Sequence, residues 1–165
     1  MGKSLRIVII AILVALQVFV GIPEYMTDGP YMLRALSYSF FHASWWHLAI
    51  NAIAIWTIYP PKRKVNFLQI VSSFLIAVVV YPLSFRPVIG FSNILYATLG
   101  LRTPSLSSAW WKQPTVIVFI VATLAMVFVP QLSATTHIAA FLCGMACSAF
   151  RRFYLNLTKD ARRYY

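Results

Sequence analysis

The stretch that decides the fold is a short apolar run, GFSNILYATLGL at residues 90–101, which is followed by Arg102. As an α-helix this run spans roughly 18 Å, whereas the hydrocarbon core of a bilayer is about 30 Å thick. A helix of this length must begin below one membrane surface if Arg102 marks the other. Non-helical backbone at that depth is stable only inside protein or beside a watered cavity. The run therefore predicts a short, recessed helix that opens with Ser92.

The rest of the chain is also strongly apolar. Of its 165 residues, 61% are hydrophobic and 10% are charged, and the mean hydropathy of +0.76 lies far outside the range of soluble domains. Five more apolar runs are long enough, or nearly so, to cross the bilayer as helices: about 7–23, 44–60, 66–83, 114–130 and 135–155. Together with the short helix at 90–102, they predict an all-α membrane protein with six transmembrane helices and a single domain, residues 1–165.

Basic residues sort to one side of this six-helix topology. Twelve of the fourteen lysines and arginines fall on the side of the two termini, and only Arg34 and Arg86 fall on the other. Cytoplasmic loops of membrane proteins carry such an excess, so both termini are expected in the cytoplasm. The net charge of +11 is attributed to this topology and not to nucleic-acid binding. No cleavage site follows the first run, so we expect it to be an uncleaved transmembrane helix. Because no organelle-targeting segment is seen, we expect a prokaryotic cytoplasmic membrane.

Polar side chains within apolar helices are costly in a bilayer and indicate function. His47 and Asn51 are four residues apart and share one face of the second helix, so both can point at a common oxygen. Ser92 opens the short helix and His137 starts the sixth helix from the same side of the membrane. Hydrogen bonding between helices is the alternative role for each residue alone. Their convergence at one depth favours a serine nucleophile activated by a histidine base.

No carboxylate lies near these residues in sequence or topology, so a Ser92–His137 dyad is the most that the chain can build. Free backbone N–H groups and the positive end of the helix dipole at Ser92 would favour a developing oxyanion. The dyad requires the fourth and sixth helices to touch. Small residues at four-residue spacing in the sixth helix, Ala140, Gly144 and Ser148, permit that close approach.

Other catalytic classes are disfavoured. The sequence has no H-E-x-x-H motif, and Asp28 and Asp160 both lie outside the apolar runs, which argues against metalloprotease and aspartyl protease sites. Cys143 and Cys147 lie deeper in the membrane than His137 and are expected to be small buried hydrophobes. No metal or cofactor is expected.

These motifs resemble those of the rhomboid family of intramembrane serine proteases, over nearly the whole chain. The segment from His42 through His47 to Asn51 resembles the family's H-x-x-x-x-H-x-x-x-N pattern. GFSNILYA at 90–97 resembles its G-x-S-G-x-x-Y-A nucleophile segment, and THIAAFLCG at 136–144 resembles its A-H-x-x-G-x-x-x-G sixth helix. Three motifs in the right order make a specific match, whereas G-x-S alone would mean little.

The resemblance implies a rhomboid-like bundle and a set of roles. Ser92 would attack a peptide bond and His137 would take its proton, while His47, Asn51 and the Ser92 amide would hold the oxyanion. The segment 130–135 would cap the site, and the substrates would be single-span membrane proteins cut near the outer bilayer surface. The implied supporting residues are Tyr96 against the His137 ring, His42 and Arg34 in the first loop, and Gly90 in the nucleophile segment.

The sequence departs from the family pattern at three positions. Asn93 and Ala140 stand where the family usually has glycine, and Leu33 stands where many members have tryptophan. Asn93 is expected to add a side chain beside the oxyanion pocket, and Ala140 a methyl group to the helix crossing. These departures support an alternative hypothesis, a catalytically inactive rhomboid-like protein that binds membrane helices. The absence of an inverted repeat argues against a small transporter.

Overall fold

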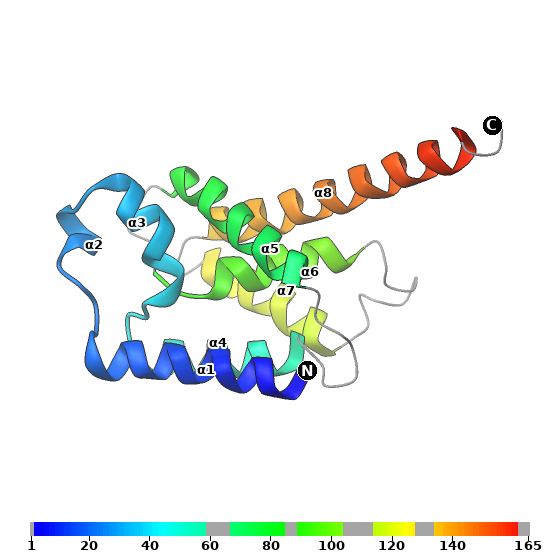
Figure 1. Cartoon of the computed structure of the whole chain (residues 1–165). Helices are drawn as coiled ribbons and strands as arrows, with labels where there is room; N and C mark the ends of the chain where they lie inside the picture. The colour runs from blue at the N-terminus through cyan, green and yellow to red at the C-terminus, as the bar shows by residue number, and fades with distance from the viewer. Residues whose placement is uncertain (1, 59–66, 85–88, 104–113, 128–133, 162–165) are drawn as a thin grey trace.

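The computed structural model describes residues 2–58, 67–84, 89–103, 114–127 and 134–161. Regular structure in these segments is entirely helical, which confirms the predicted all-α class (Figure 1). The helices are α1 (Gly2–Phe19), α2 (Tyr25–Asp28), α3 (Tyr31–Ser37), α4 (Trp45–Ile58), α5 (Phe67–Val80), α6 (Ser92–Arg102), α7 (Pro114–Val127) and α8 (Ala134–Ala161), with short 3₁₀ helices η1 (Tyr38–Phe40) and η2 (Tyr81–Leu83).

The long helices lie close to the predicted apolar runs, but the ends of the first and last differ. α1 begins at Gly2 and ends at Phe19, four residues before the predicted end. The N–H groups of Val20 and Gly21 both donate to the Leu16 carbonyl, and Gly21 has a φ of 65°, a left-handed conformation that commonly ends helices. α8 continues to Ala161, beyond the predicted end at residue 155. The prediction followed the apolar run, whereas the polar residues after it are also compatible with a helix.

The first loop contains helices that the hydropathy pattern did not predict. α2, α3 and η1 follow α1, and together they bury Met26, Ala35 and Tyr38. These elements are too short and too interrupted by Gly29 and Pro30 to show a clear period. Packing against the rest of the protein stabilises them.

Several predicted features lie outside the described residues. These are Pro130–Ser133 of the segment expected to cap the site, and the basic residues Lys62, Arg63, Lys64, Arg86, Lys112, Arg162 and Arg163.

The short helix α6 is the centre of the fold. Every residue from Phe91 to Gly100 is buried. At 11 residues, α6 is roughly 16 Å long, so it is too short to span the whole hydrocarbon core of a bilayer by itself. Its complete burial explains why it lacks a marked apolar face, since neighbouring helices cover it on all sides.

α6 and α8 approach so closely that their glycines leave no room for a side chain. A Cβ atom added to Gly144 would clash with the Ala97 carbonyl oxygen and lie 3.1 Å from the Cα of Gly100. A Cβ atom added to Gly100 would clash with the Phe141 carbonyl oxygen and lie 3.0 Å from the Met145 nitrogen. The two helix backbones are therefore in direct contact at this crossing, as the small-residue pattern predicted.

Two arginines bind the last turn of α4. The Arg6 guanidinium of α1 donates to the Trp56 carbonyl oxygen at 2.9 Å, and its Cζ atom lies 4.0 Å from the centroid of the Trp56 ring. Arg102, the last residue of α6, donates to the Ile58 carbonyl oxygen. These carbonyl groups have no partner within the helix, and positive charge is favourable at this end of its dipole. The opposite end of α4 carries His47.

One helix in the described segments is long and apolar enough to cross a bilayer by itself, Ala134–Asn156 in α8, with a mean hydropathy of 1.3. The other apolar helices, Ser4–Phe19, Trp45–Ile58 and Phe67–Leu83, are shorter than the predicted spans. In Figure 1, α1 and α4 lie side by side, and the C-terminal part of α8 projects beyond the other helices.

Candidate active site

Ser92 and His137 are in hydrogen-bond contact. Ser92 is the first residue of α6, and His137 lies in the first turn of α8. The Ser92 Oγ and His137 Nε2 atoms are 2.6 Å apart, and both residues are buried. With the proton of the neutral imidazole on Nδ1, the serine hydroxyl donates to Nε2, which is the arrangement that a general base requires. The close crossing of α6 and α8 brings the two side chains together.

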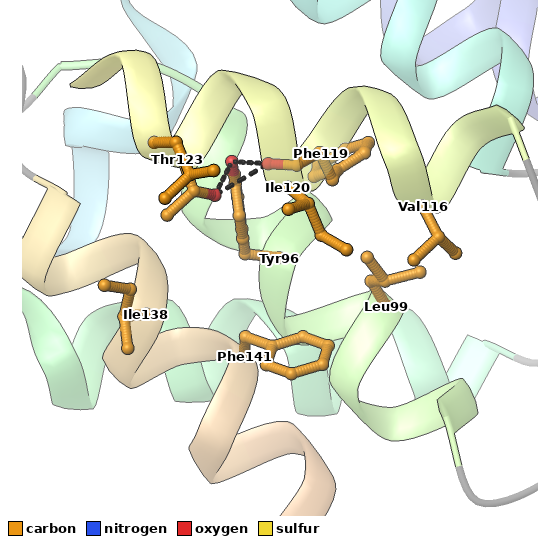
Figure 2. Close-up of a pocket in the computed structure, with 9 residues that line it drawn as sticks. Tyr96, Leu99, Val116, Phe119, Ile120, Thr123, Ile138 and Phe141 are labelled. Atoms are coloured by element: carbon orange, nitrogen blue, oxygen red, sulfur yellow. Dashed lines mark hydrogen bonds between the residues drawn. The ribbon is translucent and has the colours of Figure 1, made fainter. Parts of the chain in front are cut away.

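Tyr96 lies one turn after Ser92 on α6 and contacts the base. Its ring centroid is 4.8 Å from that of His137, with an angle of 65° between the planes. The Tyr96 hydroxyl lies 2.6 Å from Thr123 Oγ1 and donates to the Phe119 carbonyl oxygen at 3.2 Å, as the dashed lines in Figure 2 show. Both partners belong to α7. Tyr96 therefore fixes one side of the imidazole and links it to α7.

The contact between Tyr96 and α7 borders an apolar pocket. The pocket lies among α6, α7 and α8 and has a volume of about 270 Å³. Figure 2 shows Leu99 of α6, Ile120 of α7, and Ile138 and Phe141 of α8 around it. Because its walls are almost entirely hydrocarbon, the hydroxyl groups of Tyr96 and Thr123 satisfy one another there.

His47 and Asn51 lie beside the nucleophile segment. Gly90 precedes Ser92 by two residues, and a Cβ atom added to it would lie 2.7 Å from His47 Nε2 and 3.4 Å from Asn51 Nδ2. Gly90 also has a φ of 132°, which side-chain-bearing residues rarely adopt. Glycine at this position therefore lets the backbone approach both side chains. Asn51 Nδ2 is buried and has no hydrogen-bond partner among the described residues.

The start of α6 provides further donors. The Phe91 carbonyl oxygen accepts from the N–H groups of Ile94 and Leu95, at 3.1 and 3.3 Å. The amides of Ser92 and Asn93 precede these first helical bonds, where a helix has no carbonyl partners of its own. Backbone donors are thus found on the same short segment as the Ser92 hydroxyl, and the side chains of His47 and Asn51 approach that segment from α4.

His42 packs edge-on against His47 and is completely buried. The two ring centroids are 5.2 Å apart at an angle of 73°. His42 lies in the loop between η1 and α4, and neither ring nitrogen has a hydrogen-bond partner within the described segments. Burial, and secondarily the nearby His47, lower the pKa of His42 from 6.5 to about 4. His42 is therefore neutral at physiological pH.

We expect His42 to make the folded protein sensitive to acid. In the unfolded chain His42 takes up a proton near pH 6.5, whereas in the folded protein it does so only near pH 4. The unfolded chain therefore binds one more proton than the folded protein between these pH values. The contribution of His42 to the free energy of unfolding is constant above about pH 6.5 and falls as pH is lowered toward about 4. When the thermal unfolding midpoint is measured in detergent at several pH values, it should fall less on acidification for His42→Phe than for the wild type. If the midpoints of both proteins fell equally, the acid sensitivity would come from groups other than His42.

Arg34 belongs to the first loop. It is half-buried in α3, and its backbone carbonyl oxygen accepts the N–H of Tyr38, so it helps to build the loop. Leu33, another departure from the family pattern, is exposed in the same helix.

The structure corrects the expectation for Asn93. Its side chain is fully buried, and its Nδ2 atom donates to the Tyr38 hydroxyl at 3.0 Å. It is therefore engaged with the first loop and not free beside the oxyanion donors. Ala140, the second departure, is also fully buried, and its methyl group is accommodated while Ser92 and His137 remain in contact.

Tyr38 and Thr123 are the main residues of this region that sequence reasoning missed. Tyr38 lies between Arg34 and His42 but is not among the residues that the resemblance implied, and Thr123 is one hydroxyl in an apolar run. Only the tertiary structure brings them to Asn93 and Tyr96. In the described part of the chain, no group of three histidine, cysteine or acidic side chains could hold a metal ion.

The fold and the site define an all-helical protein with a buried serine–histidine pair at the start of two closely packed helices. The family model for the rhomboid domain matches residues 30–152, which is most of the chain and includes Ser92, His137, His47 and Asn51. The chain therefore belongs to the rhomboid family, as its motifs predicted, and is an integral membrane protein of a family of intramembrane serine proteases. No curated protein and no solved structure matches it.

Proposed function

We propose that this protein is a serine endopeptidase that cleaves transmembrane proteins within or near the bilayer. The observation that carries the proposal is the 2.6 Å contact between Ser92 Oγ and His137 Nε2 in a member of the rhomboid family. A serine hydroxyl is a weak nucleophile unless a base accepts its proton, and this contact supplies one.

In the proposed reaction, Ser92 Oγ attacks the carbonyl carbon of the scissile bond while its proton passes to His137 Nε2. The resulting oxyanion accepts hydrogen bonds from the Ser92 amide, His47 and Asn51. Collapse of this intermediate breaks the C–N bond, and His137 donates its proton to the leaving amine. Water, deprotonated by His137, then hydrolyses the acyl-enzyme and regenerates Ser92. A dyad suffices here because Tyr96 orients the imidazole ring that an aspartate orients in a triad.

The proposed setting follows from the same topology. The whole chain would form one domain with six transmembrane helices, including the short α6, and both termini would lie in the cytoplasm of a prokaryote. The site would then face the outer side, where a substrate helix leaves the bilayer and its peptide bonds become accessible.

The test is covalent labelling of the purified, membrane-reconstituted protein by a fluorophosphonate probe. We expect the wild type to be labelled, with mass spectrometry locating the adduct on Ser92. Asn51→Ala keeps both members of the dyad but removes an oxyanion donor, so its labelling should be about 10²–10³ times slower. A folded wild-type protein that stays unlabelled would refute the proposal. It would favour the alternative, a rhomboid-like protein that binds membrane helices without cutting them.

A further inference from the structure

Tyr38 forms hydrogen bonds with residues on both sides of Ser92 in the sequence. Its backbone carbonyl oxygen accepts the N–H of Gly90 at 3.0 Å, and its hydroxyl oxygen accepts Asn93 Nδ2 at 3.0 Å. Gly90 comes two residues before Ser92, and Asn93 comes one residue after it. Tyr38, a single residue of η1, is thus hydrogen-bonded to one residue that precedes Ser92 in the chain and to one that follows it.

Tyr38 is itself firmly anchored. Its hydroxyl donates to the Ala77 carbonyl oxygen of α5 at 2.8 Å, and its ring stacks on Tyr81 with centroids 4.8 Å apart. The residue is fully buried. Burial raises the pKa of Tyr38, so the hydroxyl keeps the proton that it donates.

The direction of these hydrogen bonds is fixed. Because the single hydroxyl proton of Tyr38 is used on Ala77, the hydroxyl can only accept from Asn93. The other amide atom, Asn93 Oδ1, is buried with no partner among the described residues. Because Oδ1 makes no hydrogen bond there, the bond from Nδ2 to Tyr38 is the one that holds the Asn93 side chain in place. A glycine at position 93 could not make it.

The same linkage reaches the oxyanion donors. Gly90, held by the Tyr38 carbonyl group, packs against His47 and Asn51. Tyr38 therefore sets the position of Ser92 relative to the donors on α4, while the contact between α6 and α8 sets it relative to His137.

We propose that Tyr38 and Asn93 are positioning residues, forming a clamp that holds Ser92 in register with the base and the oxyanion donors. This inference rests on the proposed function. It reverses the expectation from the family pattern: Asn93→Gly, which restores the usual glycine, slows the reaction at Ser92 because it releases the clamp.

A double-mutant cycle tests the clamp. Tyr38→Phe and Asn93→Leu each remove the hydrogen bond while nearly preserving shape. The full-length, membrane-reconstituted proteins are labelled with the fluorophosphonate probe, and rates are expressed per folded molecule over a range of probe concentrations. We expect each variant to lower the maximal labelling rate by about 10- to 100-fold, since small misplacements of reacting groups have effects of this size. The half-saturating probe concentration should stay nearly unchanged, and the double variant should be no slower than the slower single variant.

The matched control is Tyr81→Phe, which removes a hydroxyl from the same stacked pair but leaves the bond between Tyr38 and Asn93 intact. Its maximal rate should equal that of the wild type. Additive effects, variants as fast as the wild type, or faster labelling of Asn93→Gly would overturn the clamp while the proposed function stands. An unlabelled wild type overturns the proposed function, and the clamp with it.

Discussion

Replacing His137 by alanine is expected to slow fluorophosphonate labelling of Ser92 by about 10⁴–10⁶-fold, to the level of Ser92→Ala. Its Nε2 atom lies 2.6 Å from Ser92 Oγ at this buried site and is placed to accept the hydroxyl proton. Nucleophile and base act as one unit in serine hydrolases, so losing either removes nearly the whole effect.

Leu142→Ala is a suitable control for this prediction. It lies on the same helix, and its side chain is 55% exposed, so it should label at the wild-type rate. Labelling of His137→Ala at a tenth of the wild-type rate or more would show that another group activates Ser92.

Replacing Gly144 by valine is expected to disrupt the fold itself. Its new side chain would meet the Ala97 carbonyl oxygen and the Leu101 nitrogen, both of which belong to the backbone of α6 and cannot move aside without moving the helix. Overpacking of a close-packed interior commonly costs about 1–3 kcal/mol, and a clash between two backbones lies at the upper end or beyond it. We expect a lower thermal unfolding midpoint in detergent and loss of labelling at Ser92, because separation of α6 from α8 also separates the dyad.

Ala146→Val adds bulk to an exposed position of the same helix and should change neither quantity. If Gly144→Val unfolds at the wild-type temperature and still labels, α6 and α8 have more freedom than their contact indicates.

The long helices and the contact between Ser92 and His137 could be predicted from the sequence, because both leave a recognisable pattern of apolar runs and isolated polar residues. An apolar run must be helical in a bilayer, and a serine and a histidine at the same depth of two small-residue helices have few other roles. The resemblance to rhomboid proteins added Gly90 and Tyr96, which the structure places at His47 and His137.

The partners of the polar side chains could not be predicted. Asn93 was expected to add a side chain beside the oxyanion pocket because it follows Ser92 in sequence, but its hydrogen-bond partner in space is Tyr38. Arg6 was counted only as a basic residue near the first helix, whereas its guanidinium is buried against Trp56. Such pairings join residues about 50 positions apart, and no local pattern encodes them.

The two arginines at the end of α4 bear on the order in which the chain assembles. Synthesis proceeds from the N-terminus, so Arg6 is already made when the Trp56 carbonyl group emerges, whereas Arg102 follows Ile58 by 44 residues. The donor to the Trp56 carbonyl group therefore precedes α4 in synthesis, and the donor to the Ile58 carbonyl group follows it. Since α4 carries His47 and Asn51 and α6 carries Ser92, the bond from Arg102 to the Ile58 carbonyl group ties the helix of the proposed oxyanion donors to the helix of the proposed nucleophile.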